Sequence, residues 1–202
     1  MGKIFNYEPK LEQEDIESLN SCLQQGFASP SYINNLESEL SSYYDSEVVC
    51  CASGTSALHL SLLACGIGPG DEVICPALTF SATWNSILYT GAMPIFCDVK
   101  EDTWCIDVEK IEDLITDNTK AIMSVDLYGN PCDYDSIRKL CDKHGLYFVS
   151  DAAESLGSLY KGKPCTALAD ISAVSFNVNK IITGNGGGAV IINNPSLSAT
   201  KV

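Results

Sequence analysis

A lysine with apolar neighbours stands near the end of the chain, in the stretch SAVSFNVNKIITGNGGGAVII at residues 172–192. One apolar run ends at Ser175, Lys180 follows beside two isoleucines, and a glycine-rich turn leads into a second apolar run. A lysine between two buried strands is costly unless its amine is used. We therefore expect Lys180 to hold an aldehyde cofactor as a Schiff base. A solvated lysine in a surface loop is the alternative.

The segment SGTS at residues 53–56 is a candidate phosphate site. It follows an apolar run and opens a helical pattern, so backbone amides, the helix dipole and several hydroxyls would surround an anion. An ordinary helix N-cap explains the same residues equally well. The candidate ligands are Gly54, Thr55 and Ser56, with Ser53 before them.

Asp151 ends another apolar run, LYFVS, where a buried carboxylate needs a cationic or hydrogen-bonding partner. It could be the counter-ion that keeps a pyridine nitrogen protonated, because an opposite charge nearby raises the pKa of that nitrogen. It could instead cap a short helix over AAESLG. Glu154 would then complete a capping box or contact the edge of a ring.

Phe80 begins the predicted helix after the run ICP, where its ring could stack on a planar cofactor or pack in the core. A phosphate site, a stacking ring, a buried carboxylate and an isolated lysine together indicate pyridoxal 5′-phosphate chemistry. Two glycine-rich runs do not support a dinucleotide, because both precede a strand, whereas the fingerprint requires a strand, glycines and then a helix. An oxidoreductase is therefore disfavoured.

Seven apolar runs predict strands, and helical patterns separate most of them. Most runs are continuous rather than alternating, which indicates strands covered on both faces in a largely parallel sheet. We therefore predict a three-layer α/β fold with a mostly parallel seven-stranded sheet. One domain would span residues 1–202, with N-terminal helices over 1–45 and the sheet core over 46–194. The predicted strands are EVVCCA, GPGDEVICP, PIFCDV, KAIMSVDLYG, LYFVSDAA, DISAVSF and GAVIIN.

Composition excludes several classes of protein. The 202 residues carry a formal net charge of -14 and include a single arginine, Arg138, in a predicted helix, which argues against a nucleic-acid-binding protein. No apolar run could span a membrane and the N-terminus lacks a signal-peptide pattern, so we expect a cytoplasmic protein. Ten cysteines form no C-x-x-C pair and mostly lie in apolar runs, so we expect reduced core thiols and no metal site.

Four segments resemble the DegT-type sugar aminotransferases, which are pyridoxal phosphate enzymes of the aspartate-aminotransferase fold (type I). They are SGTSALHLSLLACGIGPGDEVICPALTF, VDLYGNPCDYDSI, SDAAESLGSLYKGK and SFNVNKIITGNGGGAVI. The resemblance covers nearly the whole chain from about Gly26, and the motifs occur in the family's order. The form SFNxNK is similar to members that aminate C4 of a nucleotide-linked 4-keto-6-deoxy sugar.

The resemblance implies a role for each candidate residue. Lys180 would hold the cofactor and move the proton between the amino carbon and C4′ of the cofactor. Asp151 would pair with the pyridinium nitrogen, Phe80 would stack on the ring, and Glu154 would approach the phenolic oxygen, where many relatives have glutamine or histidine. The phosphate would be bound by Gly54, Thr55, Ser56 and Ser175.

Members of this family run to nearly twice this length, so the resemblance implies a large-domain portion without the small C-terminal domain. That domain, partly across a dimer, carries the substrate-anion contacts, for which this chain offers only Lys161 and Lys163. The expected reaction moves an amino group from L-glutamate to a nucleotide-linked keto sugar, in nucleotide-sugar and polysaccharide biosynthesis, within a homodimer. The alternative is a catalytically silent fragment that binds the cofactor or a partner.

Overall fold

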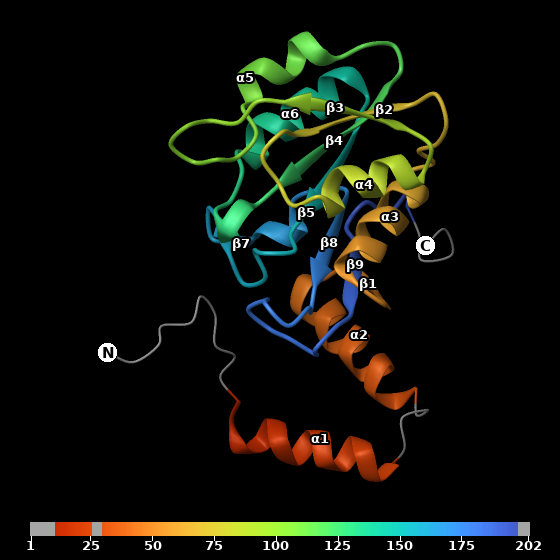
Figure 1. Ribbon diagram of the computed structural model, residues 1–202, viewed down its shortest axis with the longest axis vertical. Helices are drawn as coiled ribbons and strands as arrows, with labels where there is room; N and C mark the ends of the chain where they lie inside the picture. The colour runs from red at the N-terminus through yellow and green to blue at the C-terminus, as the bar shows by residue number, and fades with distance from the viewer. Residues whose placement is uncertain (1–10, 26–29, 198–202) are drawn as a thin grey trace.

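The computed structural model describes residues 11–25 and 30–197, and a seven-stranded sheet lies at its centre (Figure 1). The strand order is β1-β9-β8-β5-β4-β2-β3. The strands are β1 (Glu47–Cys51), β2 (Glu72–Pro76), β3 (Met93–Cys97), β4 (Thr119–Val125), β5 (Tyr147–Asp151), β8 (Ile171–Ser175) and β9 (Gly188–Ile192). The predicted strands and the mostly parallel sheet are confirmed.

Strand β9 runs antiparallel to both of its neighbours, β1 and β8, whereas the other pairs in the sheet are parallel. Because β9 reverses the direction twice across the sheet, β1 points the same way as β8. The carboxyl ends of β1, β2, β4, β5 and β8 therefore meet at one edge, and the segments that follow these strands can form a common site.

The predicted helices are also present. They are α1 (Gln13–Gln25), α2 (Ser31–Tyr44), α3 (Gly54–Ala64), α4 (Ala82–Tyr89), α5 (Val108–Ile111) with the 3-10 turn η1 (Glu112–Leu114), and α6 (Tyr134–His144). A small hairpin of β6 (Leu159–Tyr160) and β7 (Lys163–Pro164) was not predicted. The two ends of the predicted 1–202 domain lie outside the described residues.

The continuous apolar runs arise because helices cover both faces of the sheet. In β2, Val73 and Cys75 pack in one cluster with residues of α3 and α4, and Ile74 packs in a second cluster with residues of α6. Strand β4 repeats this division, with Met123 in the first cluster and Ile122 in the second. Alternate side chains of a strand point to opposite faces, so burial of both faces requires apolar residues at every position.

The cysteines carry free thiols, and most contribute to these clusters. This confirms the prediction of reduced thiols that pack as small core residues. The buried ones are Cys65, Cys75, Cys97, Cys105, Cys132, Cys141 and Cys165.

Helix α1 contains no buried residue, and Figure 1 shows it apart from the sheet. It is one of the predicted N-terminal helices, and its apolar residues Ile16, Leu19 and Leu23 are exposed. Among the described helices, none has the length and apolar character needed to cross a membrane.

Candidate functional site

A cavity of about 330 Å³ opens at the edge of the sheet where the carboxyl ends of the strands meet. Its walls come from the segments that follow β1, β2, β4, β5 and β8. Every predicted site residue except Ser56 lines it, so residues far apart in the sequence share one site. Those residues are Gly54, Thr55, Phe80, Asp151, Glu154, Ser175 and Lys180.

Helix α3 begins at one end of this cavity, and Ser53 is its N-cap. The Ser53 Oγ accepts a hydrogen bond of 3.1 Å from the amide of Ser56, and the two hydroxyls lie 3.0 Å apart. Ser53 and Ser56 therefore cap the helix, as the N-cap alternative proposed. Gly54 and Thr55 line the cavity together with Ser53, and the amides of a first helical turn have no intrahelical acceptor.

Glycines let the start of α3 lie directly against the sheet. A Cβ at Gly54 would lie 2.7 Å from the Cβ of Ser175, and a Cβ at Gly188 would lie 2.6 Å from the carbonyl carbon of Ser53. Neither position has room for a side chain. Gly54 at the start of α3 and Gly188 at the start of β9 thus allow the helix to approach β8 closely, which leaves the helix amides beside the Ser175 hydroxyl.

Asp151 is buried, with 5% of its surface exposed, and it is held by two donors. The hydroxyl of Thr83 donates to Oδ2 at 2.8 Å, and the amide of Ala153 donates to Oδ1 at 3.2 Å. Residues 152–157 form turns, so the alternative in which Asp151 caps a helix over AAESLG is wrong. An Asp with so little water around it is a suitable partner for a cationic ring nitrogen.

Burial raises the pKa of Asp151 to about 6, and its neighbours modify this effect. The hydrogen bonds from Thr83 and Ala153 and the charge of Lys180 lower the pKa, whereas the charge of Glu154 raises it further. Each of the first three stabilises the ionised carboxylate, and a second carboxylate destabilises it. The strong perturbation within a cavity is typical of a functional site.

Lys180 lies in the loop that follows β8, and 16% of its side chain is exposed. Its Nζ lies 3.4 Å from Glu154 Oε1, and it is the only basic side chain among the described residues that line the cavity. The prediction that Lys180 lies between two buried strands is confirmed, because β8 and β9 are buried, although the neighbouring Ile181 and Ile182 in the loop are exposed. The amine itself is nevertheless enclosed and directed toward the cavity.

Glu154 joins two segments across the cavity. Its Oε2 accepts a hydrogen bond of 2.7 Å from the amide of Tyr128, and its Oε1 contacts Lys180. The capping-box alternative is therefore wrong, because no helix follows Asp151. Glu154 instead connects the turn after β5 to the 3-10 turn η2 (Leu127–Gly129), which follows β4.

Phe80 lies at the mouth of the cavity with 73% of its surface exposed. Helix α4 starts two positions later, at Ala82, so Phe80 belongs to the loop before the helix rather than to its first turn. The alternative in which Phe80 packs in the core is wrong. An exposed ring at the mouth is free to cover a planar ligand.

Sequence patterns did not single out Thr83 or Asp126. The Thr83 hydroxyl contacts both Asp151 and the hydroxyl of Thr79, at 2.7 Å from the latter. Asp126 is fully buried after β4 and accepts from Tyr134 at 2.8 Å and from Ser155 at 2.7 Å. In the sequence, Thr83 could have been noticed because it lies four positions after Thr79, and Asp126 because it is a carboxylate at the end of an apolar run.

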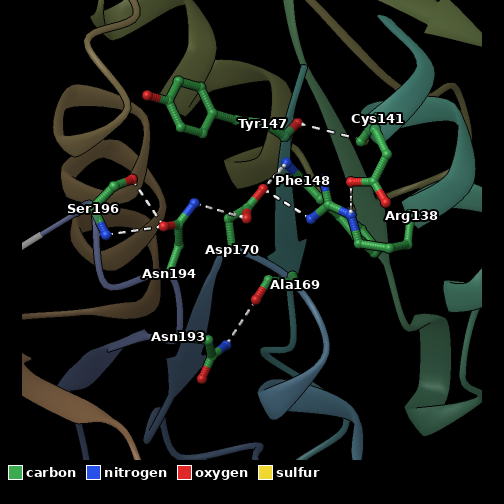
Figure 2. A network of polar contacts seen from close by, with 10 residues as sticks. Arg138, Cys141, Tyr147, Phe148, Ala169, Asp170, Asn193, Asn194 and Ser196 are labelled. Carbon is green, nitrogen blue, oxygen red and sulfur yellow. Dashed lines mark hydrogen bonds and ion pairs between the residues drawn. The ribbon is translucent and has the colours of Figure 1, made fainter. Parts of the chain in front are cut away.

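Arg138 belongs to a structural network at the opposite edge of the sheet, shown in Figure 2. Its Nε donates to Asp142 at 2.8 Å and a terminal nitrogen donates to Asp170 at 3.0 Å, while Asp170 also accepts from the amide of Phe148 at 2.7 Å. The single arginine therefore does not serve the cavity. Lys161 pairs with Asp135, and neither Lys161 nor Lys163 lines the cavity.

Comparisons with known proteins identify relatives of this chain. The model of the DegT/DnrJ/EryC1/StrS aminotransferase family matches residues 9–201. GDP-perosamine synthase of Escherichia coli O157:H7 is 45% identical over 200 residues, which cover 98% of this chain and 55% of that protein. The chain spans about half the length of the curated relatives it matches.

Solved structures show the same fold. An aminotransferase from Psychrobacter cryohalolentis superimposes with a TM-score of 0.88 at 37% identity, covering 94% of this chain and 49% of that one. NtdA from Bacillus subtilis, with bound cofactor PMP, superimposes with a TM-score of 0.87 at 35% identity, covering 95% of this chain and 45% of that one.

Proposed function

The chain belongs to the DegT/DnrJ/EryC1/StrS aminotransferase family, and we propose that it forms the cofactor-binding part of an aminotransferase that acts on a nucleotide-linked sugar. Pyridoxal 5′-phosphate is the proposed cofactor and Lys180 is the proposed attachment residue. The observation that carries the proposal is the enclosure of the Lys180 amine in one cavity with the buried Asp151.

The residues present fit this cofactor. Gly54 and Gly188 allow the start of α3 to lie against β8 and β9, and the first-turn amides and the Ser175 hydroxyl at this place suit a phosphate. At the other end, Asp151 has the buried position expected of a partner for a protonated ring nitrogen. Phe80 at the mouth can cover the face of a ring between these two ends.

The cofactor would supply an electron-accepting ring and an aldehyde that bonds to amines. The chain's own residues would do the rest. The Lys180 amine would bind the aldehyde carbon and then carry a proton at Nζ between two carbon atoms. Asp151, as a carboxylate, would keep the ring nitrogen protonated. Glu154, 3.4 Å from Nζ, would orient the Lys180 amine.

We further propose a nucleotide-linked 4-keto-6-deoxy sugar as the amino acceptor, L-glutamate as the donor, and a homodimer as the assembly. The name of the Escherichia coli relative, GDP-perosamine synthase, supports a GDP-linked sugar. The alternative function is cofactor or partner binding without turnover. It is favoured by one observation, since Lys180 is the only basic side chain among the described residues of the cavity, and two anionic substrates would need more.

The test of the central assignment is chemical labelling. Purified protein is incubated with pyridoxal 5′-phosphate, reduced with borohydride and digested, and the labelled peptide is identified by mass spectrometry. We expect the label on Lys180 in the wild-type protein and no label in Lys180→Ala. The control Lys163→Ala should be labelled like the wild-type protein, since Lys163 is exposed. Labelling on another lysine, or equal labelling of both variants, would contradict the proposal.

A second measurement separates the two functions. Addition of L-glutamate to the cofactor-loaded protein should convert its visible absorbance to that of the amine form of the cofactor if the chain has enough side chains to bind the amino donor. Unchanged absorbance after confirmed labelling of Lys180 would favour binding without turnover. Sedimentation equilibrium of the same sample tests the homodimer.

A further inference from the structure

Two exposed aromatic side chains meet just outside the cavity. Trp104 and Tyr128 are 52% and 79% exposed, and their ring centroids lie 6.2 Å apart at an interplanar angle of 60°. Tyr128 adjoins Leu127, which lines the cavity, and its amide is bound to Glu154. The aromatic pair is therefore joined directly to the candidate site.

The loops that carry these rings are braced. The backbone φ angles of Trp104 and Tyr128 are 60° and 54°, a left-handed conformation that bulky residues rarely adopt. The side-chain amide of Asn130 donates to the carbonyl of Thr103 at 3.0 Å, and the Cys105 thiol donates to the carbonyl of Asn130 at 3.4 Å. Such strain persists only where the surroundings enforce it, and here it holds two large rings in water.

Trp104 also lines a second hollow, of about 660 Å³. Leu78 lines this hollow, and Thr79 and Phe80 line the cofactor cavity, so one short loop separates the two spaces. A ligand that crosses this loop could place one end in each. This is the arrangement that an elongated ligand such as a nucleotide-linked sugar requires.

The second hollow is acidic. The charges of its two lysines are neutralised in ion pairs, since Lys110 pairs with Asp98 and Asp107, and Lys100 pairs with Glu109. Two further carboxylates line the hollow, those of Glu101 and Asp102, and neither forms an ion pair within the described residues. Carboxylates repel phosphates but accept hydrogen bonds from N–H groups, so the hollow suits a base rather than a diphosphate.

We propose that Trp104 and Tyr128 bind the purine base of the nucleotide-linked substrate, one ring stacked on its face and the other, tilted by 60°, against its edge, with Glu101 and Asp102 accepting hydrogen bonds from the base. Guanine fits this surface because its ring N–H and its amino group lie side by side and can both donate to one carboxylate. The inference rests on the proposed function, which supplies the nucleotide. It adds that this chain itself selects the base.

The sequence contains two tryptophans, Trp84 and Trp104, so the indole N–H signals of ¹⁵N-labelled protein report on two sites only. Guanosine, which carries no phosphate, is the probe and is added without pyridoxal 5′-phosphate. The Trp104 signal is expected to move in a saturable way while the Trp84 signal stays fixed. Uridine and inorganic pyrophosphate should produce much smaller shifts.

Variants test how much the aromatic rings and the carboxylates each contribute to guanosine binding. Tyr128→Ala should weaken guanosine binding at least about fivefold, since stacking on one aromatic ring contributes about 1 kcal/mol or more per base. The control Tyr89→Ala, an exposed ring that contacts His59 instead, should leave it unchanged. Asp102→Asn should weaken guanosine more than inosine, which lacks the amino group.

The inference is overturned if guanosine leaves the Trp104 signal fixed at millimolar concentration, or if pyrophosphate moves it equally. It is also overturned if the Trp104 signal changes with protein concentration alone, which would show that a second copy covers this surface. Because the titration omits the cofactor, its result is independent of the labelling of Lys180. A loss of labelling with intact guanosine binding would therefore reject only the proposed function.

Discussion

The Thr83 hydroxyl donates a 2.8 Å hydrogen bond to Asp151, and this buried contact joins α4 to the end of β5. The bond and burial have opposite effects on the pKa of Asp151. The bond lowers this pKa because it stabilises the ionised carboxylate, whereas loss of water raises it. Thr83 thereby adjusts the proton affinity of the proposed counter-ion from a helix on one face of the sheet. The cavity depends on this helix for its chemistry as well as for its shape.

Replacement of Thr83 by valine should raise the pKa of Asp151 above its present value of about 6. Valine keeps the shape of threonine but removes the donor, so the ionised form loses about 1–2 kcal/mol of stabilisation, or roughly one pKa unit. The pKa is measured from the carboxyl ¹³C signal of Asp151. Thr79→Val is the control, because it leaves the bond from Thr83 to Asp151 in place. Equal pKa values in both variants would refute this role.

Asp151→Asn should stabilise the cofactor-free protein at neutral and higher pH. The pKa of Asp151 is raised from 3.8 to about 6, so the folded protein prefers the protonated acid. The stabilising contribution of that proton is present below the unfolded pKa and is lost as the pH rises through about 6. Asparagine stays neutral, so the variant should gain roughly 1–3 kcal/mol at about pH 8 and about half as much at about pH 5.

Urea unfolding of the wild-type protein and the Asp151→Asn variant at both pH values measures this gain. Because other titrating groups act equally in the two proteins, the difference isolates Asp151. A gain of the same size at both pH values would indicate an effect of packing rather than of charge. Labelling of Lys180 by pyridoxal 5′-phosphate should weaken in the same variant, so that stability and function change in opposite directions.

The strands and the common site edge were predictable because both follow from local pattern. Continuous apolar runs specify strands covered on both faces, and parallel strands bring their carboxyl ends together. Partners from distant segments were not predictable. The donor to Asp151, Thr83, lies 68 positions away, and the amide bound by Glu154 lies 26 positions away. The exposure of Ile181 also escaped prediction, since an apolar residue in a loop pattern does not reveal which way it faces.

Gly54→Ala should destabilise the protein. The added Cβ would lie 2.7 Å from the Cβ of Ser175, a distance that forces α3 and β8 apart. We expect a loss of about 1–3 kcal/mol, as for other overpacked sites. The control is Gly68→Ala, where the added Cβ meets nothing within 4 Å. Chemical denaturation compares the two, and equal stability would show that the helix start can shift without cost.

Arg138→Gln should destabilise the fold but leave the cofactor site intact. Asp170, of which 13% of the side chain is exposed, would lose the guanidinium at 3.0 Å and keep the amide donors of Phe148 and Asn194. A largely buried carboxylate without its cation should cost about 1–3 kcal/mol.

This network lies at the amino ends of β5 and β8, opposite the cavity, so borohydride labelling of Lys180 should proceed as in the wild-type protein (Figure 2). Lys139→Gln, an exposed change on the same helix, is the matched control and should alter neither stability nor labelling. Loss of labelling in folded Arg138→Gln would place Arg138 in the functional machinery. The structure predicts the opposite, because both of its acidic partners hold Arg138 away from the site.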